Sequence, residues 1–297
     1  MKKLGGRFLI VVTAALIALN AQWGLAQSFK KVSVQGSPAM ASVSAGSSSV
    51  WALDQGGNPY VLQNNTFVST QLLSLSKIAV GGGTAVQPDQ VWAVDSSDNV
   101  YNAVRNGSSW TFSQVPGVLT QIAVGPGYQD SCHPYEVWGI NPAGAVFRYN
   151  SCSKQFEQFS GTLAQIVVGS GDVWGLNSAN AIFKLDFGTL KFKQLPGSLT
   201  KIAIGPEEVW GVNSSQQVFV LNPFTQKFIR LSGVLAQIQA GGNGLWGLNS
   251  SLGIFRFEPA TFKFVQIQGT LTSISVGTGA GVWGINSSAD VYAFSTP

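Results

Sequence analysis

Hydrophobic and polar positions alternate along this chain in short runs that return in a fixed order. Between residues 199 and 231, turn residues separate four such runs: Leu199–Gly205, Val209–Asn213, Gln217–Leu221 and Lys227–Leu231. Runs of about five residues with a period of two, rich in β-branched and aromatic residues, predict β-strands. No helical periodicity appears beyond residue 26. The chain is therefore predicted to be all-β, and its unit contains four strands, named a to d in chain order.

The four-strand unit returns seven times. Strand a ends on Ile-x-Val-Gly or a close variant, and strand b reads Val-Trp-Gly-x-Asn or a variant. The strand-b tryptophans are Trp51, Trp92, Trp138, Trp174, Trp210, Trp246 and Trp283. They lie 36 to 46 residues apart, and four strands in a unit of this length are typical of one β-propeller blade. The longest a–b connections, Gly81–Gln90 and Gly125–Glu136, belong to neighbouring units. We predict them as loops that thicken one edge of one face.

The strand count predicts how the propeller closes. Strands a, b and c occur seven times, but the chain ends shortly after the seventh strand c, Val291–Phe294. The missing strand d is matched by Phe29–Val32, near the other end of the chain. We therefore predict a single propeller of seven four-stranded blades, in which Phe29–Val32 pairs with Val291–Phe294. Closure of this kind protects the sheet edges that an open array would leave exposed.

The first 26 residues have the pattern of a secretory signal peptide. Met1–Arg7 is short and basic, Phe8–Leu19 is apolar, and Gly24–Ala26 supplies small residues for cleavage. The apolar run is too short to span a membrane. We therefore predict a leader over 1–26 and a propeller over 27–297. The protein would be secreted, or periplasmic or on the cell surface in a bacterium.

Loss of the leader changes the charge of the protein. Without its three basic residues, the number of lysines and arginines falls from 17 to 14, against 13 acidic residues, so the net charge falls from +4 to +1. A sequence pI of about 9.1 therefore owes part of its value to the leader. Because no basic stripe remains in the mature chain, we expect no nucleic-acid partner. No further apolar stretch reaches the length of a membrane span, so we expect no membrane insertion.

Cys132 and Cys152 are the two cysteines of the chain. In an exported protein two cysteines usually pair. Cys132 precedes strand b of the third unit, and Cys152 follows strand c of the same unit. In an antiparallel pair these two points lie at the same end of the blade. We predict a disulfide that clamps the longest insertion onto its own blade.

The repeated tryptophan and asparagine of strand b are the candidate ligand-binding residues. The tryptophan is interpreted either as a core residue between blades or as a platform on which a sugar ring stacks. The asparagine is interpreted either as a turn former or as an amide that bonds sugar hydroxyls. In the first two units aspartates, Asp54 and Asp95, replace it. The candidate site residues are Trp138, Asn141, Trp174, Asn177, Trp210, Asn213, Trp246, Asn249, Trp283 and Asn286.

Other side chains give weaker signals. Glu136, Asp172 and Glu208 each precede the valine of strand b in consecutive units, which predicts an acidic arc, either a solvated rim or a polar ligand or cation site. The single histidine, His133, stands inside an insertion. The chain has no histidine cluster, nucleophile elbow or phosphate-binding loop. We therefore expect a protein that is not an enzyme and uses no cofactor or metal.

The repeated phrases resemble the tectonin repeat. The third unit carries Gly117, Leu119 and Ile122, then Val137-Trp138-Gly139-Ile140-Asn141, and units 4 to 7 repeat the pattern closely. The resemblance covers essentially the whole mature chain. It implies a β-propeller, usually of six blades, so that six is the alternative to our count of seven.

Several tectonin proteins are lectins, so the resemblance also suggests a function. It implies a secreted, multivalent carbohydrate-binding protein that recognises glycans on microbial or cell surfaces. The alternative is a non-catalytic propeller scaffold for protein interactions.

Overall fold

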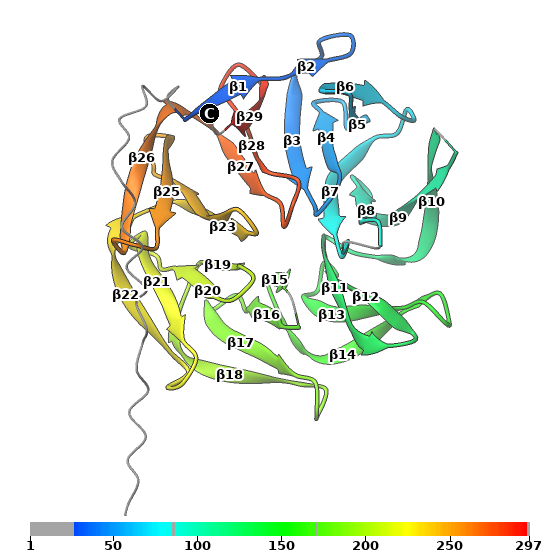
Figure 1. The fold of residues 1–297 in the computed structure, drawn as a ribbon. Coiled ribbons are helices and arrows are strands. Elements are labelled where there is room, and N and C mark those ends of the chain that lie inside the picture. Colours follow the sequence, from blue (N-terminus) through cyan, green and yellow to red (C-terminus); the bar gives the residue numbers. More distant parts are fainter. Residues whose placement is uncertain (1–26, 85–86, 108, 170, 296–297) are drawn as a thin grey trace, which may run out of the picture.

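The structure is a computed structural model that describes residues 27–84, 87–107, 109–169 and 171–295. The predicted leader, residues 1–26, lies outside the described residues. Within the described part, no helix is long and apolar enough to cross a membrane. The described chain forms seven sheets arranged in a ring around a central axis (Figure 1). The prediction of seven four-stranded blades is confirmed.

The blades follow one another in chain order, each with strand a nearest the axis. Blades 1 and 2 are formed by β3 (Met40–Ala45), β4 (Val50–Asp54), β5 (Pro59–Gln63), β6 (Thr66–Ser69), then β7 (Leu75–Gly81), β8 (Gln90–Asp95), β9 (Asn99–Asn106), β10 (Ser109–Val118). Blades 3 and 4 are formed by β11 (Gln121–Asp130), β12 (His133–Ile140), β13 (Ala145–Asn150), β14 (Gln155–Thr162), then β15 (Gln165–Val168), β16 (Val173–Leu176), β17 (Ala181–Asp186), β18 (Lys191–Ser198). Blades 5 and 6 are formed by β19 (Lys201–Ile204), β20 (Val209–Val212), β21 (Gln217–Asn222), β22 (Lys227–Val234), then β23 (Gln237–Gly241), β24 (Gly244–Leu248), β25 (Gly253–Glu258), β26 (Lys263–Thr270). Blade 7 is formed by β27 (Ser273–Val276), β28 (Val282–Ile285), β29 (Val291–Ser295) and the N-terminal β1 (Ser28–Lys31).

The N-terminal segment closes the ring as predicted and then goes further. β1 pairs antiparallel with β29, with Phe29 opposite Phe294. The chain then crosses to blade 1, where β2 (Ser33–Val34) pairs in parallel with β6. Blade 1 thus has a fifth strand that the sequence did not predict. Because one short segment bonds both blade 7 and blade 1, it holds the two sides of the seam together.

Seven hydrophobic clusters, each shared by two adjacent blades, form the core. The strand-b tryptophans lie inside these clusters. Six of them meet, edge to face, a phenylalanine on strand d of the next blade, with ring centroids 5.7 to 6.2 Å apart. Trp210 instead meets Phe257 on β25, at 4.9 Å. Trp283 of blade 7 meets Phe67 of blade 1. The ring is therefore closed by its core as well as by β1.

In blades 3 to 7 the residue after the tryptophan is a glycine, and it has a packing reason. A Cβ on Gly175 would stand 2.4 Å from Cδ1 of Leu163, which comes from the d–a link entering the same blade. Gly139 and Leu119 repeat this contact at 2.3 Å. Since real Cβ atoms do not approach so closely, the leucine of the link and the glycine of strand b require one another.

Of the two insertions, the second differs from the predicted loop. Gly81–Gln90 does form a connection between β7 and β8, but the second insertion lengthens β11 and β12 into a hairpin. Its register shifts between Pro126 and Asp130. The physical reason is that an insertion between antiparallel strands can continue their ladder rather than leave it. In the first insertion, Asp89 accepts backbone N–H bonds from Ser47, Ser48 and Ser49 at 2.8 to 2.9 Å, which joins blade 2 to blade 1.

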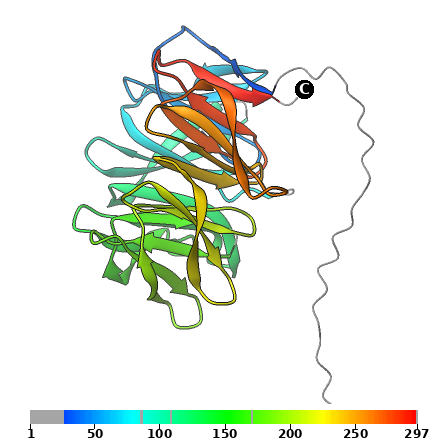
Figure 2. The ribbon, with the colours of Figure 1, turned by 90° about the vertical axis from the view of Figure 1, so that its left-hand side faces the viewer.

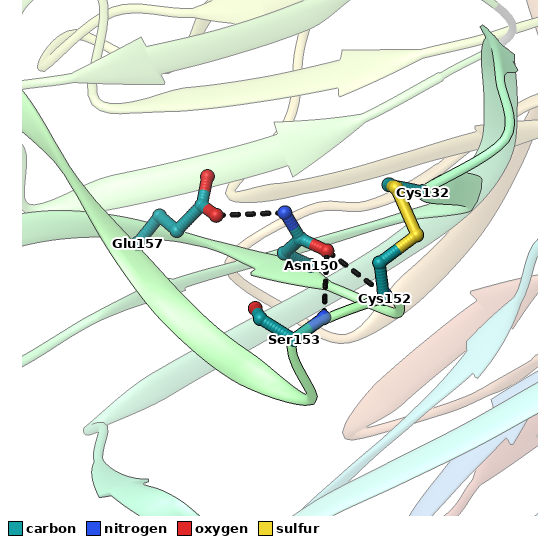
Figure 3. Close-up of a disulfide and its surroundings, with 5 residues drawn as sticks. All are labelled: Cys132, Asn150, Cys152, Ser153 and Glu157. Carbon is teal, nitrogen blue, oxygen red and sulfur yellow. Dashed lines mark hydrogen bonds between the residues drawn. A yellow bond between two sulfur atoms is a disulfide. The ribbon is translucent and has the colours of Figure 1, made fainter.

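The predicted disulfide between Cys132 and Cys152 is present, with Cα atoms 5.0 Å apart (Figure 3). It joins the β11–β12 turn to the β13–β14 turn. Asn150 supports the second turn, because its Oδ1 accepts the N–H bonds of Cys152 and Ser153. Its Nδ2 donates to Glu157 across the hairpin. The bond therefore clamps the extended hairpin of blade 3 onto the outer part of the same blade.

Reduction of this disulfide is expected to lower the free energy of unfolding by about 3 kcal/mol, the chain-entropy value for a loop of this length. The closed loop spans a sequence separation of 20 residues. Chemical denaturation of the Cys132→Ser, Cys152→Ser double variant measures the effect without reductant. An unchanged denaturation midpoint in that variant would contradict the expectation.

Candidate functional site

The strand-b tryptophans are buried. Their exposed fractions lie between 0 and 8 %, and aromatic neighbours from the next blade cover them. The structure thus places Trp138, Trp174, Trp210, Trp246 and Trp283 in the inter-blade core. A sugar cannot stack on a ring whose faces are already packed. The sequence allowed either a core residue or a sugar-stacking platform, and the observed burial fits a core residue.

The strand-b asparagines stand at the b–c turns, where each uses its side-chain oxygen to build the turn. Asn177 Oδ1 accepts the backbone N–H bonds of Ala179 at 3.0 Å and Ala181 at 2.9 Å. Asn141, Asn213, Asn249 and Asn286 repeat both bonds. The turn explains why this position selects asparagine or aspartate. The turn uses only the side-chain oxygen, so the Nδ2 group of each asparagine can donate two hydrogen bonds to other partners.

The Nδ2 groups differ between blades. Asn213 Nδ2 donates to Gln217, and Asn286 Nδ2 lies 3.5 Å from the hydroxyl of Tyr292. In blade 2, both carboxylate oxygens of Asp95 are occupied, because Oδ1 accepts backbone N–H bonds and Oδ2 accepts bonds from Asn99 and Tyr101. Asn177 is half-buried at the rim of blade 4, and its amide nitrogen makes no hydrogen bond to the described residues. That nitrogen can donate to a ligand.

The sequence analysis assigned no functional role to a recurring aromatic residue on strand c, which belongs to the repeated pattern as in Val146-Phe147. It stands six positions after the asparagine or aspartate in all seven blades: Tyr60, Tyr101, Phe147, Phe183, Phe219, Phe255 and Tyr292. Its register partner on strand b is the small residue that follows the tryptophan, as Gly175 is for Phe183. Since neighbouring residues of a strand face opposite ways, this ring points away from the tryptophan side, toward the preceding blade. The constant spacing is the signal that identifies it.

A hollow of about 310 Å³ between blades 3 and 4 brings the asparagine and this aromatic residue together. Blade 3 contributes Ser160 and Thr162, and blade 4 contributes Asn177, Phe183 and Lys191. A second hollow of about 450 Å³ on the same side of the ring is also lined by Asn177. The first hollow therefore combines an aromatic ring, an amide donor, hydroxyl groups and an ammonium group within a volume suited to a small ligand.

The predicted acidic arc separates into three different environments. Glu136 is only 1 % exposed and forms a buried ion pair with Arg148 at 2.5 Å, while Trp138 Nε1 donates to it at 2.6 Å. The expectation of a solvated rim is therefore wrong for Glu136, because a cation on the neighbouring strand allows the carboxylate to be buried.

The other two carboxylates of the arc are closer to solvent. Asp172 forms a half-exposed ion pair with Lys184 at 2.8 Å. Glu208 is exposed, and partial burial, followed by the nearby Glu207 carboxylate, raises its pKa. Among the described residues, no group of three or more acidic, histidine or cysteine side chains is placed to hold a metal ion. The three carboxylates thus do not form one shared site.

A family model of the tectonin domain matches residues 26–189, 89–227 and 162–296. These overlapping matches cover the whole propeller. The chain belongs to the tectonin family. No curated protein matches this tectonin by sequence.

Several solved structures share the fold of this tectonin propeller. YCF48 bound to D1 peptide superposes with a TM-score of 0.66 at 11% identity, over 91% of this chain and 97% of that one. YCF48 from Cyanidioschyzon merolae gives 0.63 at 10% identity, over 90% and 98%. Prp20p from Saccharomyces cerevisiae gives 0.63 at 12% identity, over 87% and 83%. At these identities the likeness concerns the fold alone.

Proposed function

We propose that this tectonin is a secreted, non-catalytic lectin that binds surface glycans through hollows between its blades. The observation that carries the proposal is the hollow between blades 3 and 4, where the Asn177 amide and the Phe183 ring line one cavity. The leader pattern and the disulfide support an oxidising location outside the cytoplasm. The asparagines stay in the proposed site, and the tryptophans support it by holding the blades together.

The chemistry of the hollow suits a sugar. The face of an aromatic ring complements the apolar C–H face of a pyranose. The hydrogens of those C–H bonds carry a small positive charge, which the negative face of the ring attracts. The Asn177 amide donates hydrogen bonds, and the hydroxyls of Ser160 and Thr162 both donate and accept. A few placed polar groups around an apolar surface are what orient a small ligand in a pocket.

Repetition explains how weak sites would give useful binding. Each blade offers an equivalent asparagine or aspartate and an equivalent aromatic residue, so several sugars of one surface can be held at once. Simultaneous binding of linked sites raises avidity by a factor on the order of 10² or more. Blades 3 to 7 carry asparagine, whereas in blade 2 the oxygens of Asp95 are already occupied. We expect the later blades to bind better.

The triple variant Asn177→Ala, Asn213→Ala, Asn249→Ala tests the proposal. We expect its retention on a glycan-coated surface to fall about tenfold or more, because multivalent binding weakens steeply as sites are lost. Binding of a free monosaccharide by the parent protein should be weak. A glycan array supplies the ligand, and surface plasmon resonance measures the retention.

Asn222→Ala is the matched control for that experiment. Asn222 ends β21 and builds a turn in the same way, with its Oδ1 accepting the N–H bonds of Phe224 and Thr225. Its turn joins strands c and d, at the opposite face from the b–c turns. The control shows what the loss of one such turn does to glycan retention when the turn lies away from the proposed sites. If the glycan surface retains the triple variant as strongly as it retains Asn222→Ala, the asparagines are turn formers only.

The extended β11–β12 hairpin favours a second candidate function, a scaffold for protein interactions. The disulfide holds this hairpin rigid, and a rigid projection at one edge of a propeller is a suitable contact surface for a protein. Shortening the hairpin and the Gly81–Gln90 connection tests this function by pull-down. Those deletions should leave glycan retention unchanged if the sugars bind at the asparagine rim.

A further inference from the structure

Exposed apolar side chains gather on the outer strands and turns of blades 4, 5 and 6. Among the described residues, the large hydrophobic side chains that are exposed in these three blades are Leu190, Phe224, Ile229, Val234, Phe262 and Val265. Phe224 is 94 % exposed, and Phe262 is 65 % exposed although its ring also meets Phe257 edge to face at 5.9 Å. No packing in the monomer accounts for a phenylalanine that stands almost entirely in water.

Three of these side chains occupy equivalent c–d turns. Leu190 lies between β17 and β18, Phe224 between β21 and β22, and Phe262 between β25 and β26. Leu190 and Phe262 adopt φ values of 54° and 53°, in the left-handed region that glycine and asparagine occupy at much lower cost. The same position of the c–d turn holds Lys154 in blade 3 and Gln226 in blade 5, also with positive φ, so the turn itself does not require an apolar side chain. We call the three c–d turns that carry Leu190, Phe224 and Phe262 the apolar turns.

Each apolar turn is followed by a lysine at the start of strand d. These lysines are Lys191, Lys227 and Lys263, and none forms an ion pair with the described residues. Lys191 also lines the hollow between blades 3 and 4, so Lys227 and Lys263 are the two that serve the apolar turns alone. The acidic residues that end strand c in blades 4 and 6 are already paired, Asp186 with Lys193 and Glu258 with Arg256. The apolar turns are therefore bordered by uncompensated positive charge.

We propose that the apolar turns dock this protein on the surface of an anionic lipid bilayer. Apolar side chains with adjacent lysines are the combination that enters the boundary between headgroups and acyl chains. Turns at one face of a closed ring lie near one plane, and a bilayer offers a flat surface that can meet all three. A polysaccharide offers no apolar phase for a phenylalanine. This contact is interfacial, so it requires no membrane-spanning segment.

The proposal gives the two faces of the ring different tasks. The apolar turns lie at the c–d end of their blades, whereas Asn177 and its equivalents lie at the b–c end. The edge view in Figure 2 shows the ring as a flat disc, with its two faces on opposite sides. Docking through the c–d turns therefore leaves the asparagine rim directed away from the bilayer. The proposal does not rest on glycan binding, because vesicles without sugar test it.

Co-sedimentation with lipid vesicles tests the docking surface. We expect the purified protein to bind mixed phosphatidylcholine–phosphatidylglycerol vesicles, to bind phosphatidylcholine vesicles weakly, and to be released by salt. The Phe224→Ser, Phe262→Ser double variant should bind the mixed vesicles at least about tenfold more weakly, since burial of one phenylalanine ring changes affinity by about tenfold or more. The Lys227→Gln, Lys263→Gln variant should lose the preference for anionic vesicles.

Leu72→Ser is the matched control, because Leu72 is 81 % exposed in the d–a link at the other face. Its vesicle binding should equal that of the parent protein. Phe224→Trp adds a direct readout, a blue shift of tryptophan fluorescence when anionic vesicles are added. The proposal is overturned if the parent protein ignores both kinds of vesicle, or if Leu72→Ser loses as much binding as the double variant. Capture of a protein by these turns without any vesicle binding would assign them to a protein partner instead.

Discussion

Deletion of Gln27–Val34 is expected to lower the melting temperature by about 10–20 °C. This is the shift that corresponds to a decrease of roughly 5 kcal/mol in the free energy of unfolding for a protein of about this length. The deleted segment supplies β1, whose ladder with β29 runs from Ser28 to Lys31. It also supplies Phe29, whose ring lies 5.9 Å from Trp246 and 5.4 Å from Phe294. Blade 7 would lose its outer strand and blade 1 the short pairing of β2. Differential scanning calorimetry measures the change.

Single substitutions in β1 separate the two contributions. Phe29→Ala removes the aromatic packing but keeps the backbone ladder, so it should cost about 2–3 kcal/mol for a half-buried ring. Lys30→Ala is the matched control, because this neighbour is exposed and pairs in the same ladder. Its melting temperature should stay close to that of the parent protein. A deletion variant that melts with the parent protein would show that β1 does not close the ring.

Replacement of Glu136 by alanine is expected to reduce the free energy of unfolding by about 3–5 kcal/mol, because it leaves a buried guanidinium without its counter-charge. Arg148 is 5 % exposed, and its Nε and Nη2 both donate to Glu136. Its guanidinium also lies over the rings of Trp138 and Phe187 at 5.7 and 5.8 Å. A water that entered the space left by the side chain would carry no counter-charge. Urea denaturation measures the change.

The equivalent pair of the next blade provides the control. Asp172 and Lys184 occupy the same two positions in blade 4, but each side chain is about one third exposed. Asp172→Ala should therefore cost less than about 1 kcal/mol, as is usual for surface ion pairs. The Glu136→Ala, Arg148→Met double variant should recover much of the loss, since it removes both buried charges. Equal destabilisation by Glu136→Ala and Asp172→Ala would contradict this account.

The repeat made much of the fold predictable from the sequence. Counting strands gave seven blades and identified the N-terminal segment as the missing outer strand, because the period of a repeat and a leftover strand are both visible in the primary structure. The cysteine pairing followed from the direction of two neighbouring strands. The position of Asn177 at a turn was also predictable, since an asparagine builds such a turn with its own neighbouring backbone. Apart from the closing strand, which the strand count revealed, these features depend on residues close together in the chain.

Features that depend on the adjacent blade were decided by the tertiary structure. A period of two shows which side chains share a face of a sheet, but not what covers that face. Phenylalanines of the next blade help to cover the strand-b tryptophans, and Ser160 and Thr162 of the preceding blade line one hollow with Phe183. Glu136 and Glu208 occupy equivalent positions in the repeat, yet one is buried and the other exposed. Their difference arises because Arg148 faces Glu136, whereas the equivalent residue in blade 5 is Val220, which has no charge. The sequence by itself thus determined the blade and the number of blades, and the packing of blade against blade determined which side chains remain available for a ligand.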